Sequence, residues 1–82
     1  MSKELQLKII SLKEVVYNDY ADSVTLPTKS GEITVLPHHA LLISHLANGT
    51  IRAKSTGQQK PFPIEGGFME VTPGSRLTIL LA

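Results

Sequence analysis

The 82-residue sequence predicts an all-β fold, a two-sheet antiparallel β-sandwich of short strands that forms one domain over residues 1–82. Three observations support this prediction. Apolar and polar residues alternate with period two along most of the chain, turn-forming pairs interrupt the alternation at short intervals, and no segment has the periodicity of a long amphipathic helix. Each sheet would then have one apolar face, which only a second apolar layer can cover.

The first predicted strand shows the pattern most simply. Leu5, Leu7 and Ile9 alternate with Gln6 and Lys8, which is typical of a half-buried strand. The same alternation recurs in further segments, whose apolar residues are Val24 and Leu26, Ile33 and Val35, Ile51 and Ala53, Phe62 and Ile64, Met69 and Val71, and Leu77, Ile79 and Leu81. We therefore expect seven to nine short strands.

Turn-forming residues separate these segments. Asn48-Gly49 is the sharpest signal, since both central positions of a type I′ hairpin need a positive φ that this pair tolerates. The other turn signals are Asn18-Asp19, Ser30-Gly31, Ser55-Thr56-Gly57, Gly66-Gly67 and Pro73-Gly74. Gly66-Gly67 predicts a bulge or a close approach of two strands.

Two prolines define one predicted edge. Pro61 and Pro63 flank Phe62, and neither has a backbone N–H to donate to a neighbouring strand. This stretch is therefore expected to be an edge strand or an extended loop, and never a central strand.

The composition excludes several classes of function. The chain has no cysteine, so it has neither disulfides nor thiolate metal ligands. Its formal net charge is +1 without a basic stripe, and it has only two Phe and two Tyr for base stacking, which argues against nucleic-acid binding. The longest apolar runs, residues 40–43 and 79–82, are too short to span a bilayer.

The candidate catalytic residues are few. His39 and His45 would lie about 20 Å apart on an extended chain, and adjacent His38 and His39 would point to opposite faces, so no metal site is expected. Glu65 and Glu70 are interpreted as solvent-facing carboxylates. The sequence also has neither a Gly-x-Ser-x-Gly elbow nor a phosphate-binding loop. We expect no catalytic residue, metal or cofactor.

Several motifs in order resemble one family. They are DSVTLPT at residues 22–28, GEITVLP at 31–37, His39-Ala40, the Leu-x-x-Gly-x-Ile pattern at 46–51 and GGFMEV at 66–71. Together they are closely similar to the signature of the epsilon subunit of F-type ATP synthase. The chain departs from it at Leu41, where that family usually has proline. It also ends at Ala82, where typical members continue into a hairpin of two helices.

The resemblance implies a non-catalytic subunit of the central stalk, the rotor. Such a subunit binds the gamma subunit and the c-ring and couples proton-driven rotation to ATP synthesis, without a cofactor and without forming a functional homo-oligomer. It is peripheral to the membrane, on the cytoplasmic face of the inner or plasma membrane. Because the helical hairpin is absent, we expect assembly and coupling without the inhibition of ATP hydrolysis that those helices contribute.

The resemblance also implies contact residues. Ser30, Gly31 and Glu32 would contact the c-ring, while His39 and Ser44 would contact gamma. Glu32 could alternatively be a turn carboxylate in water, and an ion pair at such an exposed site is worth only about 0–1 kcal/mol. Attachment should therefore depend on a broad apolar patch, whose residues the motifs do not identify.

Two other functions stay open at this point. A stand-alone β-sandwich adaptor for some other protein would have the same alternation, although it would have no reason to keep the motifs in order. A cupin-like metal enzyme is suggested faintly by residues 31–39, but the His-x-His pair and the downstream Glu of cupins are missing.

Overall fold

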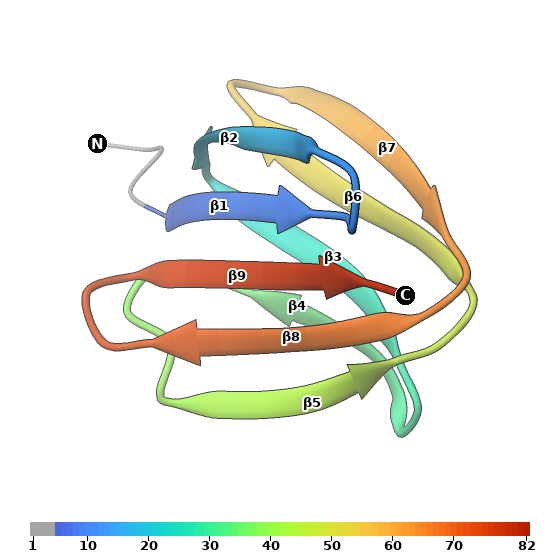
Figure 1. Ribbon diagram of the computed structural model, residues 1–82. Helices are drawn as coiled ribbons and strands as arrows, with labels where there is room; N and C mark the ends of the chain where they lie inside the picture. The colour runs from blue at the N-terminus through green and yellow to red at the C-terminus, as the bar shows by residue number, and fades with distance from the viewer. Residues whose placement is uncertain (1–4) are drawn as a thin grey trace.

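A computed structural model describes residues 5–82, and residues 1–4 of the predicted domain lie outside the described part of the chain. Within residues 5–82 every regular element is a strand (Figure 1). The strands are β1 (Leu5–Ile10), β2 (Val15–Ala21), β3 (Ser23–Thr28), β4 (Gly31–Val35), β5 (Leu42–Leu46), β6 (Gly49–Ser55), β7 (Gln58–Ile64), β8 (Gly67–Thr72) and β9 (Arg76–Leu81). The predicted all-β fold is confirmed.

The strands form two layers. One layer has the order β2-β1-β9-β8-β5, and the other has the order β4-β3-β6-β7 (Figure 1). The layers are continuous, because β5 of the first pairs with β3 of the second at one position, Leu46 opposite Thr28. The molecule is therefore a single sheet folded at that corner into a two-layered sandwich.

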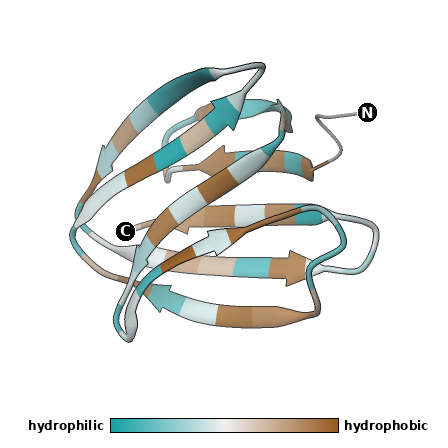
Figure 2. Cartoon of the chain, turned by 180° about the vertical axis from the view of Figure 1, so that it is seen from behind, coloured by the Kyte–Doolittle hydropathy of each residue, from teal (hydrophilic) through white to brown (hydrophobic). Residues whose placement is uncertain are grey.

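The core lies between the layers, and alternation builds it. On β1, the residues Leu5, Leu7 and Ile9 are fully buried, while Lys8 between them is exposed. Figure 2 shows the same change from hydrophobic to hydrophilic along the strands of the second layer. The other buried apolar residues are Ala21, Val24, Leu26, Val35, Leu46, Ile51, Ala53, Ile64, Met69, Val71, Leu77 and Ile79. Each fully buried aliphatic side chain stabilises the fold by about 1.5–3 kcal/mol.

One pair of strands is parallel, unlike the predicted antiparallel arrangement. β1 pairs with β9 in parallel, with Leu7 opposite Leu77 and Ile9 opposite Ile79. These are the first and last strands of the described chain, so no tight turn joins them and nothing forces them to be antiparallel. Their pairing places four buried side chains next to one another in the middle of the first layer.

The hairpin predicted at Asn48-Gly49 is wrong. Neither residue has a positive φ, and the strands on either side, β5 and β6, do not pair with each other. The chain crosses between the layers here, because β5 pairs with β8 while β6 pairs with β3 and β7. Glycine is favoured at position 49 for a different reason, since a Cβ there would lie 3.0 Å from the Pro27 ring.

The strand that contains Pro61 and Pro63 is the edge strand β7, as predicted. It pairs only with β6, while the ring of its Phe62 contacts the Tyr17 ring of β2 at 5.3 Å between centroids. Burial, and secondarily the charge of Asp19, raise the pKa of Tyr17 above its usual value. This ring contact closes the sandwich on the side opposite the β5–β3 corner.

Of the predicted glycine pair Gly66 and Gly67, Gly67 allows β8 to approach β9 closely. Both have a positive φ, 139° and 144° respectively. A Cβ at position 67 would overlap the Leu80 carbonyl oxygen on β9. Glycine is therefore required at position 67 both for its backbone conformation and for space.

We expect Gly67→Ala to destabilise the domain much more than Gly31→Ala. Gly31 also has a positive φ, 124°, but a Cβ there would have no atom within 4 Å, so only the conformational cost of about 1–3 kcal/mol applies. At Gly67 the backbone of β9 must also move. Urea unfolding of both variants measures the difference, and equal losses in unfolding free energy would show that the close approach to Leu80 is unimportant.

Candidate interaction surface

The outer faces of the two layers differ in chemistry. The second layer presents polar side chains, among them Thr25, Glu32, Arg52 and Lys54. The first layer presents a contiguous group of apolar side chains to solvent. This difference identifies the first layer as the candidate site.

Five outward side chains, four apolar residues and one histidine, form a row across the first layer that we call the apolar row. The row consists of His45 on β5, Phe68 on β8, Leu80 on β9, Ile10 on β1 and Val15 on β2. Each is directly opposite the next in the strand register. Three of them are about half exposed, with relative accessibilities of 51% for Phe68, 48% for Leu80 and 54% for Val15. The row therefore runs perpendicular to the strands from one side of the layer to the other.

The next position along each strand is mostly polar, so the row has a clear border. Ile43, Glu70, Thr78, Lys8 and Asn18 lie opposite one another there, and only Ile43 is apolar. An open hollow of about 330 Å³ lies along this border, lined by Ile43, Phe68, Met69, Glu70, Thr78 and Leu80. A contiguous apolar patch with a polar rim is typical of a protein interaction site.

The aromatic end of the row is held in place. The His45 and Phe68 rings meet edge to face, with centroids 4.6 Å apart and an interplanar angle of 66°. This arrangement is the favourable one for ring pairs. It restricts the half-exposed Phe68 side chain before any partner binds.

The sequence contains a signal for the apolar row that the family motifs do not provide. In Ile9-Ile10, Phe68-Met69 and Ile79-Leu80, two consecutive residues are apolar, so one must face outward on a strand. The register then aligns those outward residues.

The turn between β3 and β4 holds the three predicted c-ring residues in a fixed geometry. The Thr28 hydroxyl donates to the Gly31 carbonyl and accepts from the Ser30 N–H at 3.2 Å. The Glu32 carboxylate lies 3.5 Å from the Arg52 guanidinium, and both side chains are exposed. The turn can therefore present a carboxylate at the surface, although Arg52 already neutralises part of its charge.

The two residues predicted to face gamma lie outside the apolar row. His39 is half-buried in the loop of residues 36–41, with its Nδ1 2.8 Å from the Ala40 carbonyl oxygen. Ser44 is half-buried on the inward side of β5, opposite the buried Met69. Its chain neighbours Ile43 and His45 point outward instead. His39 and the Ser30–Glu32 turn lie at opposite ends of β4.

The remaining polar residues form no catalytic or metal-binding cluster within the described range. No group of three His, Cys, Asp or Glu residues lies close enough in residues 5–82 to hold a metal ion. The His38 N–H donates to the Ser75 hydroxyl at 2.8 Å, which ties the 36–41 loop to the turn before β9. No helix that could cross a membrane is formed by residues 5–82.

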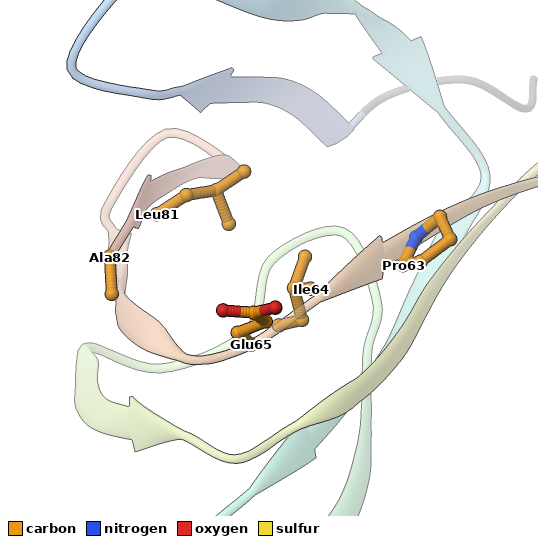
Figure 3. A pocket seen from close by; sticks show the side chains of 5 residues that line it. All are labelled: Pro63, Ile64, Glu65, Leu81 and Ala82. Carbon is orange, nitrogen blue, oxygen red and sulfur yellow. The ribbon is translucent and has the colours of Figure 1, made fainter.

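A second hollow of about 310 Å³ opens at one end of the sandwich (Figure 3). Pro63, Ile64 and Glu65 line one side of it, and Leu81 and Ala82 line the other. Glu65 is the one ionisable side chain among these five residues. Glu70 lies on the outer face of β8 instead, so the hollow lacks the paired acid and base that hydrolytic chemistry needs.

Comparison with known proteins gives one consistent family. Residues 4–82 match the family described as ATP synthase, Delta/Epsilon chain, beta-sandwich domain. The chain is similar to the ATP synthase epsilon chain of Chloroflexus aggregans, with 40% identity over 76 residues, and to that of Roseiflexus sp. (strain RS-1), with 42% identity over 76 residues. Each match covers 93% of this chain and 54% of the relative. The chain thus spans about half the length of these curated relatives.

Solved structures share the fold. A chain in the mitochondrial ATP synthase of Euglena gracilis (OSCP/F1/c-ring) superposes with a TM-score of 0.90 at 23% identity, covering 99% of this chain and 52% of that one. A chain in the central stalk/c-ring structure of Tetrahymena thermophila mitochondrial ATP synthase superposes with a TM-score of 0.78 at 15% identity, covering 98% of this chain and 64% of that one.

Proposed function

The chain belongs to the ATP synthase delta/epsilon β-sandwich family, and from this premise we propose that it is the sandwich domain of an epsilon subunit in the central stalk. In this role it catalyses no reaction itself. It binds the gamma subunit and the c-ring and passes rotation between them. The complex is membrane-bound, and the domain is peripheral to the membrane on its cytoplasmic face.

We assign gamma to the apolar row, and this row is the observation that carries the proposal. It supplies aromatic and aliphatic anchors in one plane, bordered by polar side chains, as in the centre of a stable interface. A specific interface of standard size buries about 800 Å² per partner, so it would extend from the row over neighbouring parts of the outer face of the first layer. His39 would then lie at the margin of the interface with gamma. The Ser44 side chain points inward, so only the backbone of its strand, β5, would reach that margin.

The c-ring contact is assigned to Ser30, Gly31 and Glu32. The support is geometric, because the Thr28 hydrogen bonds fix the turn and Glu32 is exposed at its end. An exposed ion pair contributes little affinity, so this contact would set orientation more than binding strength. The two assigned contacts then use different parts of one rigid body.

A stiff sandwich suits a coupling role. Hydrogen-bonded strands and a close-packed core deform little under load, so they transmit strain from one surface to another. A twist applied through the apolar row would reach the β3–β4 turn through β5, which joins the layers at Leu46 and Thr28.

We expect Phe68→Glu to reduce co-purification with gamma at least about tenfold. The substitution places a charge within the apolar row, where it would be desolvated on binding. Gln59→Glu is the matched control, because it adds the same charge at an exposed position on the second layer. Equal retention of gamma by the two variants, with folding confirmed by circular dichroism, would refute the assignment of the row.

A second expectation concerns the turn. Glu32→Ala should weaken binding to detergent-solubilised c-ring by a few-fold at most and leave gamma binding unchanged, since one exposed carboxylate is worth about 0–1 kcal/mol. Surface plasmon resonance against each partner separates the two effects. Loss of gamma binding in this variant would contradict the separate placement of the two contacts.

A further inference from the structure

Three of the four strands with an open side are protected against pairing with another chain. β7 contains Pro61 and Pro63, which have no N–H to offer, and β4 contains the charged Glu32. β2 lies against β6, where the Ser55 hydroxyl donates to the Tyr20 carbonyl at 3.1 Å. Prolines, charges and covering contacts are among the usual means by which proteins block such edges.

The fourth, β5, has an open stretch without such protection. It pairs with β8 along its whole length but with β3 only at Leu46. Around that pair, the His45 carbonyl accepts from the Lys29 N–H at 3.1 Å and the Ala47 N–H donates to the Pro27 carbonyl at 2.8 Å. Backbone groups of alternate residues point to the same edge of a strand, so those of Ile43 point to this edge too. No strand of the described chain pairs with Ile43 there.

The side chains around this stretch are equally open. Leu41 and Ile43 have relative accessibilities of 64% and 65%, and residues 40–47 contain no Lys, Arg, Asp, Glu or Pro. An uncharged apolar edge with free backbone groups is a template for an added strand. The other three strands with an open side are protected and this one is not. This arrangement is consistent with an edge that binds another strand.

We propose that the open edge of β5 accepts a short extended segment of the gamma subunit, which adds one strand to the first layer. The proposal rests on the proposed function. Gamma is the occupant because the apolar row ends at His45 on β5, so a partner that covers the row reaches this edge. Only residues 41–44 are open, since β3 occupies the edge at Leu46, so the added strand is about four residues long. Its main chain bonds to Ile43 and its outward side chain beside Ile43 is apolar.

The first test compares Ile43→Pro with Ile43→Ala in gamma binding. Proline removes the N–H that points to the open edge and leaves the hydrogen bonds between β5 and β8 in place. Alanine shortens the same side chain and keeps the N–H. We expect the proline variant to bind gamma at least tenfold more weakly than the alanine variant. Equal affinities for the two folded variants would overturn the proposal.

The second test needs no substitution at the edge. Hydrogen–deuterium exchange should show the Ile43 amide exchanging rapidly in the free chain and protected in the complex with gamma. A complex that forms with the Ile43 amide still exchanging rapidly overturns the added strand but leaves the proposed function intact. A chain that fails to bind gamma overturns both. Protection of Ile43 without gamma, with the mass of a dimer, assigns the edge to a second copy and also overturns the proposal.

Discussion

The structure depends on one constraint, the burial of two apolar sheet faces against each other. Leu7, Ile9, Leu77 and Ile79 lie side by side in the middle of the first layer, and the inward residues of the second layer cover them. A domain of this size has no second core, so every strand must give one face to this packing. The outer faces are then free to differ, and they do: one is polar and the other has an apolar row.

The features that the sequence predicted are those set by local chemistry. Alternation identified the buried residues of β1, β8 and β9, prolines placed β7 at an edge, and Gly67 marked the close approach to Leu80. The errors arose where distant pairing decides the outcome. Asn48-Gly49 has the chemistry of a hairpin, but β5 is paired with β8, so the chain crosses to the other layer instead. The parallel pairing of the terminal strands leaves no local trace, because neither strand is joined to the other by a turn.

The sequence shows that some strands have outward apolar residues, but it does not show which of these residues lie next to one another. Consecutive apolar residues such as Ile9-Ile10 show that some strands are apolar on both faces, which a half-buried strand does not require. Only the register shows that Ile10, Phe68 and Leu80 are neighbours, because β1, β8 and β9 are far apart in the chain. Ser44 illustrates the converse, since a motif match identifies a position without telling which way its side chain points. On β5 the residues on either side of Ser44 face outward.

The central claim is that gamma covers the first layer and leaves the second exposed, and the chain has no native cysteine to complicate a direct test. Single cysteines can be placed at Leu80 in the apolar row and at Lys54 on the polar face, and the rate of maleimide labelling measured with and without gamma. The account predicts that binding slows labelling at position 80 strongly and leaves position 54 unchanged. Protection at position 54 with free labelling at position 80 would contradict it.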